Sequence, residues 1–301
     1  MSDYETKTIK RLYRKAWKRH KDKLPECDAD VISLLTELDR DTQKGIPFLQ
    51  IKRDWQQCFL RARKASTLKP QYRDNLKEYS YPPHDVTARG RANLPGHPVF
   101  YGGDNLKTVL QEIDAKPGEE VYVSSWKHPG PINYIQFCYM ENSVGPIRRA
   151  TESTEKHISS FFPEAQQFKV RLALQHIMNF FLANEYGISS AMAHASLYLK
   201  GFDAVEYACA SSKDRCNYAL SPSCADRMQL FRVLRFIVEE HPATTEDDIE
   251  ITPLEIGEIR EGASEIRWVS YSADMAETDF QLWDFEDPLA RHALESPNEN
   301  K

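Results

Sequence analysis

The 301-residue chain lacks several features that would place it in an obvious functional class. It has no run of about 20 apolar residues, the length that a membrane-spanning helix needs. Charged residues stand near the N-terminus, where a secretory signal would have its apolar segment. The formal net charge of −6 excludes a generally basic coat for nucleic acid. We therefore expect a cytoplasmic protein without a membrane or nucleic-acid partner.

Cysteine and histidine occur without the spacing of a metal site. The six cysteines include no CxxC pair, and the nine histidines include no HxH or HxxxH pair. Structural zinc sites usually contain such short spacings, and a disulfide framework is typical of shorter, more cysteine-rich chains. The sequence therefore predicts reduced thiols and no metal.

Charge is distributed unevenly along the chain. Basic residues gather between Lys7 and Lys23, and acidic residues between Glu239 and Glu299. We interpret the basic stretch as the solvated face of a helix, with an arm that binds nucleic acid or a partner as the alternative. A second helix is expected from about Val31, with Asp28 or Asp30 as its N-cap.

Strand and helix patterns alternate irregularly after residue 98, which predicts an α+β fold. A short strand at Val99-Phe100-Tyr101 is followed by a helix that Asp104 or Asn105 can cap. Strands at 121–123 and 134–139 flank turn residues and are expected to form a hairpin. A helix is expected to start after Pro163. Further elements are expected as a helix at 189–199 and strands at 204–207, 217–220, 231–238 and 266–271.

The most informative residues form an ordered run between positions 59 and 112. It contains Phe59-Leu60-Arg61-Ala62-Arg63, then Gly90-Arg91-Ala92-Asn93, then Val99-Phe100-Tyr101, and then Glu112. Two arginines, a tyrosine and a carboxylate in a segment rich in Pro and Gly suit an anionic ligand that carries rings. These residues predict a nucleotide pocket.

This run resembles the RES family, which is named for an Arg, a Glu and a Ser in its active site, and the resemblance extends from about Phe59 to Pro222. Characterised members are toxins that destroy NAD+, each held in check by an antitoxin. The resemblance implies an α+β fold with an ADP-ribosyltransferase-like mixed sheet and flanking helices. It divides the chain into an N-terminal helical extension (1–55), a RES-like catalytic domain (56–240) and an acidic C-terminal region (241–301).

The resemblance implies roles for the charged residues. Glu112 becomes the catalytic carboxylate, because an ionised glutamate stabilises the cation that forms as nicotinamide leaves ribose. Arg61, which belongs to the same catalytic set, and Arg91 hold the pyrophosphate, since a guanidinium pairs with phosphate oxygens. Arg63 and Arg89 flank these arginines and are alternatives within each pair. The alternative for Glu112 is an ordinary exposed helical glutamate.

The remaining site residues surround the nicotinamide. Tyr101 is expected to stack on its ring, with a place in the core as the alternative, and Asn217 to help close the pocket. The family commonly has Tyr-Pro-Ser where this chain has Tyr207-Ala208-Cys209, so Cys209 or, two residues later, Ser211 takes the place of the catalytic serine. A thiol is a weaker hydrogen-bond donor than a hydroxyl, and Cys209 can also be a small buried hydrophobe.

Three functional hypotheses follow. The leading one is an NAD+-consuming glycohydrolase or phosphorylase, a toxin with NAD+ as its substrate and an antitoxin as its partner. The enzymatic alternative is transfer of ADP-ribose to a macromolecule. The third is a nucleotide-binding or interaction protein that shares the fold with reduced or no catalysis.

Overall fold

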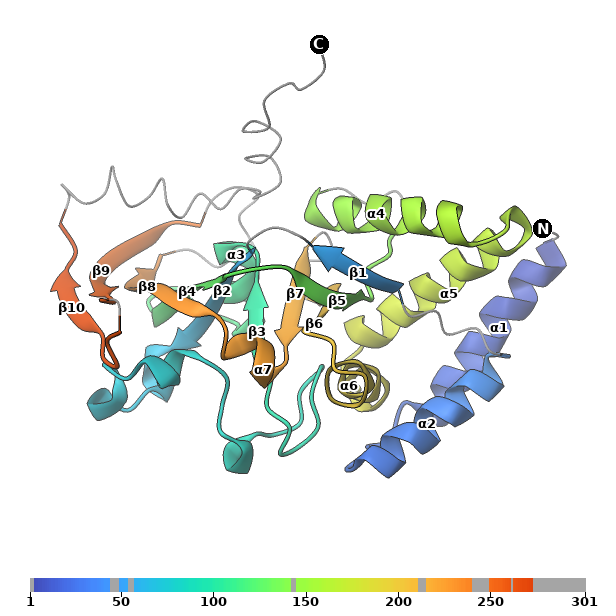
Figure 1. The fold of residues 1–301 in the computed structure, drawn as a ribbon, viewed down its shortest axis with the longest axis horizontal. Helices are drawn as coiled ribbons and strands as arrows, with labels where there is room; N and C mark the ends of the chain where they lie inside the picture. The colour runs from blue at the N-terminus through green and yellow to red at the C-terminus, as the bar shows by residue number, and fades with distance from the viewer. Residues whose placement is uncertain are drawn as a thin grey trace, which may run out of the picture. The chain divides into compact units, whose positions relative to one another are not determined.

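The structure is a computed structural model that describes residues 3–43, 49–53, 57–141, 145–210, 215–239, 249–260 and 262–272. The chain divides into two compact units, and Figure 1 labels helices and strands of both. Unit 1 comprises Met1–Asp54, Ser80–Gly102 and Pro131–Arg227, and unit 2 comprises Trp55–Tyr79, Gly103–Gly130 and Met228–Lys301. Strands and helices are mixed in each unit, which confirms the predicted α+β fold. The functional division at residues 56 and 241 stays a prediction.

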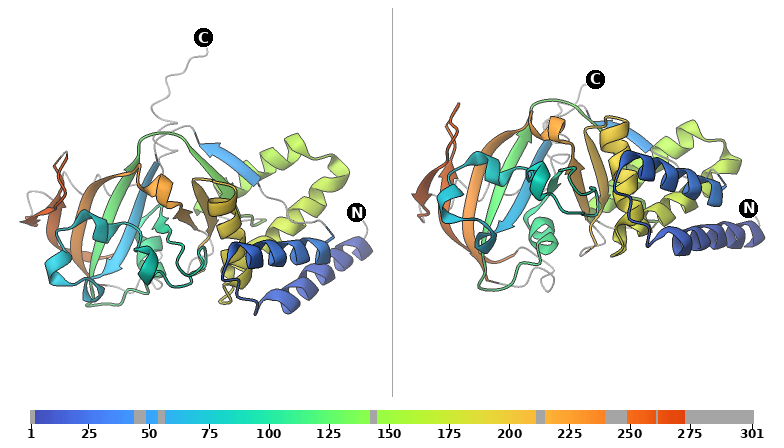
Figure 2. Two further views of the ribbon diagram at one scale, coloured as in Figure 1. Left: turned by 60° about the horizontal axis from the view of Figure 1, so that its bottom comes forward. Right: turned by 90° about the horizontal axis from the view of Figure 1, so that it is seen from below.

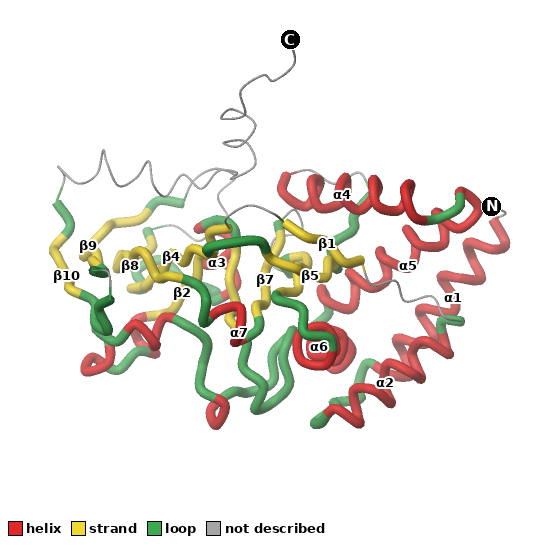
Figure 3. The backbone as a smooth tube through the Cα atoms, viewed as in Figure 1, coloured by secondary structure: helices red, strands yellow, loops and turns green. Residues whose placement is uncertain are grey.

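Unit 1 contains a mixed sheet with the strand order β1-β5-β6-β7-β3 (Figure 3, yellow). β1 pairs antiparallel with β5, β5 pairs parallel with β6, and β6 pairs antiparallel with β7. The strands predicted near Val99, at 204–207 and at 217–220 are confirmed. The strands are β1 (Leu49–Arg53), β3 (Phe100–Gly103, its last residue in unit 2), β5 (Ile132–Gln136), β6 (Ala204–Ala208) and β7 (Cys216–Leu220).

The helices predicted in unit 1 are present. Pro163 is the N-cap of α5, and α6 runs directly into a single π-helical stretch, Ala195–Leu199. The predicted N-cap of α2 was wrong: Cys27 is the N-cap, and the Asp30 carboxylate instead accepts a hydrogen bond from the Glu26 backbone N–H at 3.1 Å. The helices are α1 (Asp3–His20), α2 (Asp28–Asp41), α4 (Gly145–Phe161), α5 (Glu164–Leu182), α6 (Gly187–His194) and α7 (Pro222–Ala225).

The N-terminal helices are part of the core of unit 1. α1 and α2 lie side by side (Figure 2), and α1 packs on α5. Tyr13 stacks on His176 with a ring separation of 4.8 Å, and Trp17 stacks on Phe180 at 5.3 Å. Apolar side chains from these helices and from the sheet form one buried cluster, which includes Leu38, Val99, Phe137, Ile177, Phe181, Met192, Val205 and Tyr207.

Unit 2 contains an antiparallel set of strands in the order β2-β4-β8-β9-β10. Strands predicted near 121, 231 and 266 are confirmed. β2, β9 and, in unit 1, β1 and α4 were not predicted. The strands are β2 (Gln57–Lys64), β4 (Glu120–His128), β8 (Gln229–Val238), β9 (Ile251–Glu258) and β10 (Arg267–Ser270), and unit 2 also contains helix α3 (Leu106–Glu112).

The predicted hairpin between residues 121–123 and 134–139 was wrong. β4 pairs with β2 and β8, whereas β5 pairs with β1 and β6. A short turn favours pairing between its flanking strands, but it does not enforce that pairing when each strand has two other partners.

The C-terminal segment joins unit 2 through β9. Glu255 on this strand accepts hydrogen bonds from both Arg73, at 3.0 Å, and Arg235, at 2.6 Å. Both arginines hold the pKa of this carboxyl below its usual range, although burial opposes them. In the part of the chain that the structure describes, no helix combines the length and apolar character needed to cross a bilayer.

The stacked His176 predicts a pH-dependent stability. Burial lowers the pKa of His176 to about 4, and the positive charges of Arg14 and Lys10 act in the same direction. In the unfolded chain this histidine titrates at about 6.5, so below that pH the unfolded state binds a proton that the native state does not. We expect His176 to contribute a fall of about 1 kcal/mol in the free energy of unfolding between pH 7 and pH 5. This fall is smaller than the full pKa shift would give, because the ring is partly exposed to solvent.

The measurement is urea unfolding at both pH values for the parent and for His176→Gln. The fall between pH 7 and pH 5 should be smaller in the variant. His157→Gln, which changes a histidine that contacts Phe161 on α4, is the matched control and should behave as the parent does. An equal fall in all three proteins would contradict the assignment.

Candidate nucleotide site

The Gly90–Asn93 motif of unit 1 is a tight turn tied to strand β3. The Tyr101 hydroxyl donates to Asn93 Oδ1 at 2.7 Å and accepts from the Ala92 backbone N–H at 2.9 Å. Asn93 is 3% exposed, and its amide nitrogen donates to the carbonyls of Ala88 and Leu94. The hydroxyl of Tyr101 and the amide of Asn93 therefore hold the turn in one conformation.

Gly90 is the residue that permits this arrangement. A Cβ atom at this position would lie 2.5 Å from both Asn93 Oδ1 and the Tyr101 hydroxyl. Such distances are well below van der Waals contact, so any larger residue would displace the hydrogen bonds. The Gly-x-x-Asn spacing that marks the motif in the sequence is thus a packing requirement of the turn.

Both arginines beside this turn bind backbone carbonyls. Arg91 Nη1 donates to Phe181 O and, at 2.6 Å, to Ala183 O, and the guanidinium lies 4.9 Å from the centre of the Tyr186 ring. Arg89 Nη2 donates to Pro25 O at 2.6 Å. A cation at the last carbonyls of a helix is stabilising, so Arg91 caps α5. A pyrophosphate would have to compete with these carbonyls for the same guanidinium.

Cys209 and Asn217 lie close together at β6 and β7. Asn217 is paired with Tyr207, and the Cys209 N–H donates to Arg215 O at 2.9 Å, which continues the ladder past β6. Alternation along the strand places Cys209 on the same face as Tyr207 and Asn217. Cys209 and Asn217 are 0% and 2% exposed. Ser211, the other candidate for the serine position, lies outside the described residues.

Unit 2 holds Arg61 and Glu112. The strand of Arg61 and the helix that ends at Glu112 pack together through Leu60, Val109 and Leu110. Asn105 caps that helix, as predicted, by accepting from the Thr108 N–H at 2.8 Å. The cap fixes the start of α3, and Glu112 is exposed at its end.

The Arg61 side chain and helix α3 lie on different sides of β2. Because successive side chains alternate, Arg61 points to the face opposite Leu60, and α3 covers the Leu60 face. Arg61 pairs with Ser124, whose hydroxyl donates to Arg61 O at 3.2 Å. The register of the sheet thus places Arg61 opposite Ser124. Arg63, the alternative arginine, is engaged by Glu78 at 2.9 Å.

One buried acid was missed in the sequence. Glu206 on β6 is 2% exposed, and the Tyr218 hydroxyl donates to its Oε1 at 2.6 Å. Glutamate is seldom fully buried, and a buried carboxylate with a phenol partner is a candidate for binding or proton transfer. The signal in the sequence was an acidic residue in the middle of an otherwise apolar strand.

Comparisons with known proteins add one similarity. A scan against protein-family models and a search of curated proteins both find no match. Among solved structures the chain is similar to a chain in the crystal structure of the M. tuberculosis MbcT–MbcA toxin–antitoxin complex. The identity is 13%, the TM-score is 0.36, and the match covers 64% of this chain and 88% of the other. An identity and a TM-score this low do not indicate a function for this chain.

The hydrogen bonds between Tyr101 and the turn predict a loss of folding stability when the Tyr101 hydroxyl is removed. Tyr101→Phe leaves the Ala92 N–H and Asn93 Oδ1 without this hydroxyl, and loss of a partner for such groups costs about 1–3 kcal/mol. We expect a lower urea midpoint for this variant. Tyr72→Phe, at a tyrosine that is 45% exposed, is the matched control and should leave the midpoint unchanged. Equal midpoints for Tyr101→Phe and the parent would show that the tie adds no stability.

Proposed function

We propose that the protein is an NAD+-consuming enzyme that cleaves the bond between nicotinamide and ribose, and that it acts as the toxin of a toxin–antitoxin pair. The observation that carries the proposal is the ordered run of Arg61, Gly90–Asn93, Tyr101 and Glu112, which resembles the RES family. The α+β fold and the tightly braced Gly90–Asn93 turn support it. A rigid turn beside a sheet is a suitable base for a binding site.

The proposed chemistry needs one carboxylate. As the bond between ribose C1′ and the nicotinamide nitrogen breaks, its electron pair leaves with nicotinamide, which is then neutral and needs no proton. Positive charge develops on the ribose, and the ionised Glu112 stabilises it. Water or phosphate attacks C1′, and the proton of an attacking water passes to solvent. The exposed position of Glu112 leaves it accessible to a ligand.

The other candidate site residues are proposed to contact the substrate. Arg91 is proposed for the pyrophosphate and Tyr101 for the nicotinamide ring, with Asn217 closing the pocket. Cys209 is proposed to take the place of the family's catalytic serine. The alternative, Ser211, lies outside the described residues. A protein antitoxin is the proposed partner, and a macromolecular acceptor for ADP-ribose remains the alternative outcome of the same chemistry.

A second candidate is a nucleotide-binding or interaction protein without catalysis. The specific observation that favours it is the engagement of Arg91 by the carbonyls of Phe181 and Ala183, together with a buried thiol at position 209. Such a protein would bind NAD+ without releasing nicotinamide, or would not bind it at all.

The test follows nicotinamide release from NAD+ by chromatography for the parent and for Glu112→Gln. The substitution keeps the size of the side chain and removes its charge, so we expect a rate at least 100-fold lower, in the range found when one electrostatic contact to a transition state is lost. Glu112 is exposed, and the variant should unfold at the same urea concentration as the parent.

Glu164→Gln, an exposed glutamate in the first turn of α5, is the matched control and should retain full activity. Products identify the acceptor: ADP-ribose for water, or its phosphorylated form for phosphate. Calorimetric binding of NAD+ without release would favour the second candidate. Equal rates for the parent and Glu112→Gln would remove Glu112 from the mechanism.

A further inference from the structure

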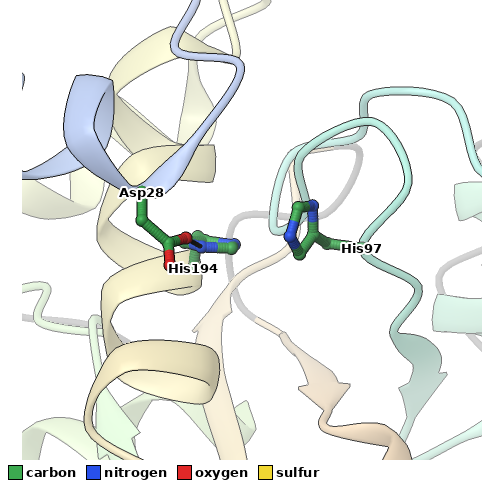
Figure 4. A group of neighbouring side chains, drawn as sticks. All are labelled: Asp28, His97 and His194. Atoms are coloured by element: carbon green, nitrogen blue, oxygen red, sulfur yellow. Dashed lines mark hydrogen bonds and ion pairs between the residues drawn. The ribbon is translucent and has the colours of Figure 1, made fainter.

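Unit 1 gathers three metal-binding side chains that the proposed chemistry does not use. Asp28 is the first residue of α2, His97 lies in the loop before β3, and His194 ends α6 (Figure 4). One donor atom from each lies within 4.8 Å of the other two. Their separation along the chain explains why no short spacing in the sequence indicated a metal.

His194 has a ring nitrogen, Nδ1, with a lone pair that could bind a metal ion. Its side chain is 0% exposed, and its Nε2 lies 2.7 Å from Asp28 Oδ1. Since a carboxylate accepts, the Nε2 atom carries the hydrogen and Nδ1 has the lone pair. Nδ1 is buried and has no hydrogen-bond partner among the described residues, which is uncommon for a buried polar atom.

His97 is oriented by its own loop. Its Nδ1 lies 3.0 Å from Pro95 O, and because a carbonyl only accepts, Nδ1 carries the hydrogen and Nε2 has the lone pair. A backbone carbonyl behind one nitrogen is the usual way in which a protein fixes a ligating imidazole. Gly96 has a φ of 71°, which allows the turn immediately before His97. Figure 4 shows one ring nitrogen of His97 pointing toward His194.

Tyr198 supports both rings. It stacks on His194 at 4.9 Å and meets His97 edge-on at 5.2 Å, and its hydroxyl donates to Pro98 O at 2.5 Å. The two imidazoles are themselves 4.6 Å apart and nearly perpendicular. The apolar ring thus limits the movement of both histidines, while the 60% exposed Asp28 leaves a path from solvent.

We propose that Asp28, His97 and His194 bind a divalent transition-metal ion of the zinc class. Two imidazole nitrogens and a carboxylate oxygen suit Zn²⁺, Co²⁺ or Ni²⁺, whereas Mg²⁺ and Ca²⁺ prefer oxygen ligands. Metal–ligand bonds of about 2.0–2.2 Å place tetrahedral donors roughly 3.4 Å apart, and one donor atom of each side chain lies within 4.8 Å of the other two. Because Asp28 accepts a hydrogen bond from Nε2 while the lone pair of His194 is on Nδ1, Asp28 exchanges that hydrogen bond for its bond to the metal. Solvent or a ligand would complete the coordination.

The site would tie three separate segments of unit 1 together. It joins the N-terminal helix α2 and helix α6 to the loop that leads from the Gly90–Asn93 turn to β3. A metal that binds only the folded chain raises its stability by mass action. The bound metal would therefore stabilise unit 1, whether or not NAD+ is cleaved.

The experiment titrates Co²⁺ into tag-free, full-length protein that has been stripped with a chelator, and follows the visible absorption of the bound ion. We expect one Co²⁺ per chain, displaced by Zn²⁺. His97→Gln and Asp28→Asn each remove one donor at a partly exposed position, and each should weaken the apparent affinity at least 10-fold. His157→Gln is the matched control and should bind as the parent does.

Thermal unfolding supplies the second readout. Zn²⁺ should raise the Tm of the parent and of His157→Gln, with little or no rise for His97→Gln and Asp28→Asn. The proposal is overturned if the parent binds no stoichiometric Co²⁺, or if all four proteins bind equally, since the three side chains would then form only a hydrogen-bonded cluster. Agreement between the two variants keeps the test valid where one of them folds poorly.

Discussion

The hydrogen bonds of the Tyr101 hydroxyl are the constraint on which much of unit 1 depends. They attach the Gly90–Asn93 turn to β3, and they are possible only because Gly90 has no side chain. With the turn fixed, Arg91 reaches the end of α5. The loop that follows carries His97 toward His194. The Tyr101 phenol therefore fixes the Gly90–Asn93 turn, which leads into the loop of one proposed metal ligand, His97.

Several charged side chains in this protein bind backbone carbonyls or pair with one another. Arg91 and Arg89 satisfy carbonyls, and Arg235 and Arg73 converge on Glu255. Such contacts replace water for groups that are partly buried, and buried charges need partners. A nucleotide phosphate would therefore bind by exchange with existing contacts, which ties ligand affinity to the stability of the ends of the helices.

Local elements were predictable where a residue acts on its neighbours. Asn105 caps α3 and Pro163 starts α5 because their side chains act within one turn of helix. The N-cap of α2 was misassigned because an aspartate can bind the backbone from outside the cap position, as Asp30 does. β2 was missed because Arg61 and Arg63 interrupt its apolar pattern, and their partners come from other segments.

The sequence by itself determined the α+β class and most helix positions, because periodicity, caps and glycine act over a few residues. Only the tertiary structure decided that β4 pairs with β2 and β8, that Arg61 and α3 lie on opposite sides of β2, and that Asp28, His97 and His194 meet. Such contacts depend on the packing of segments that are tens of residues apart in the sequence. A local sequence pattern does not predict which of these segments pack together.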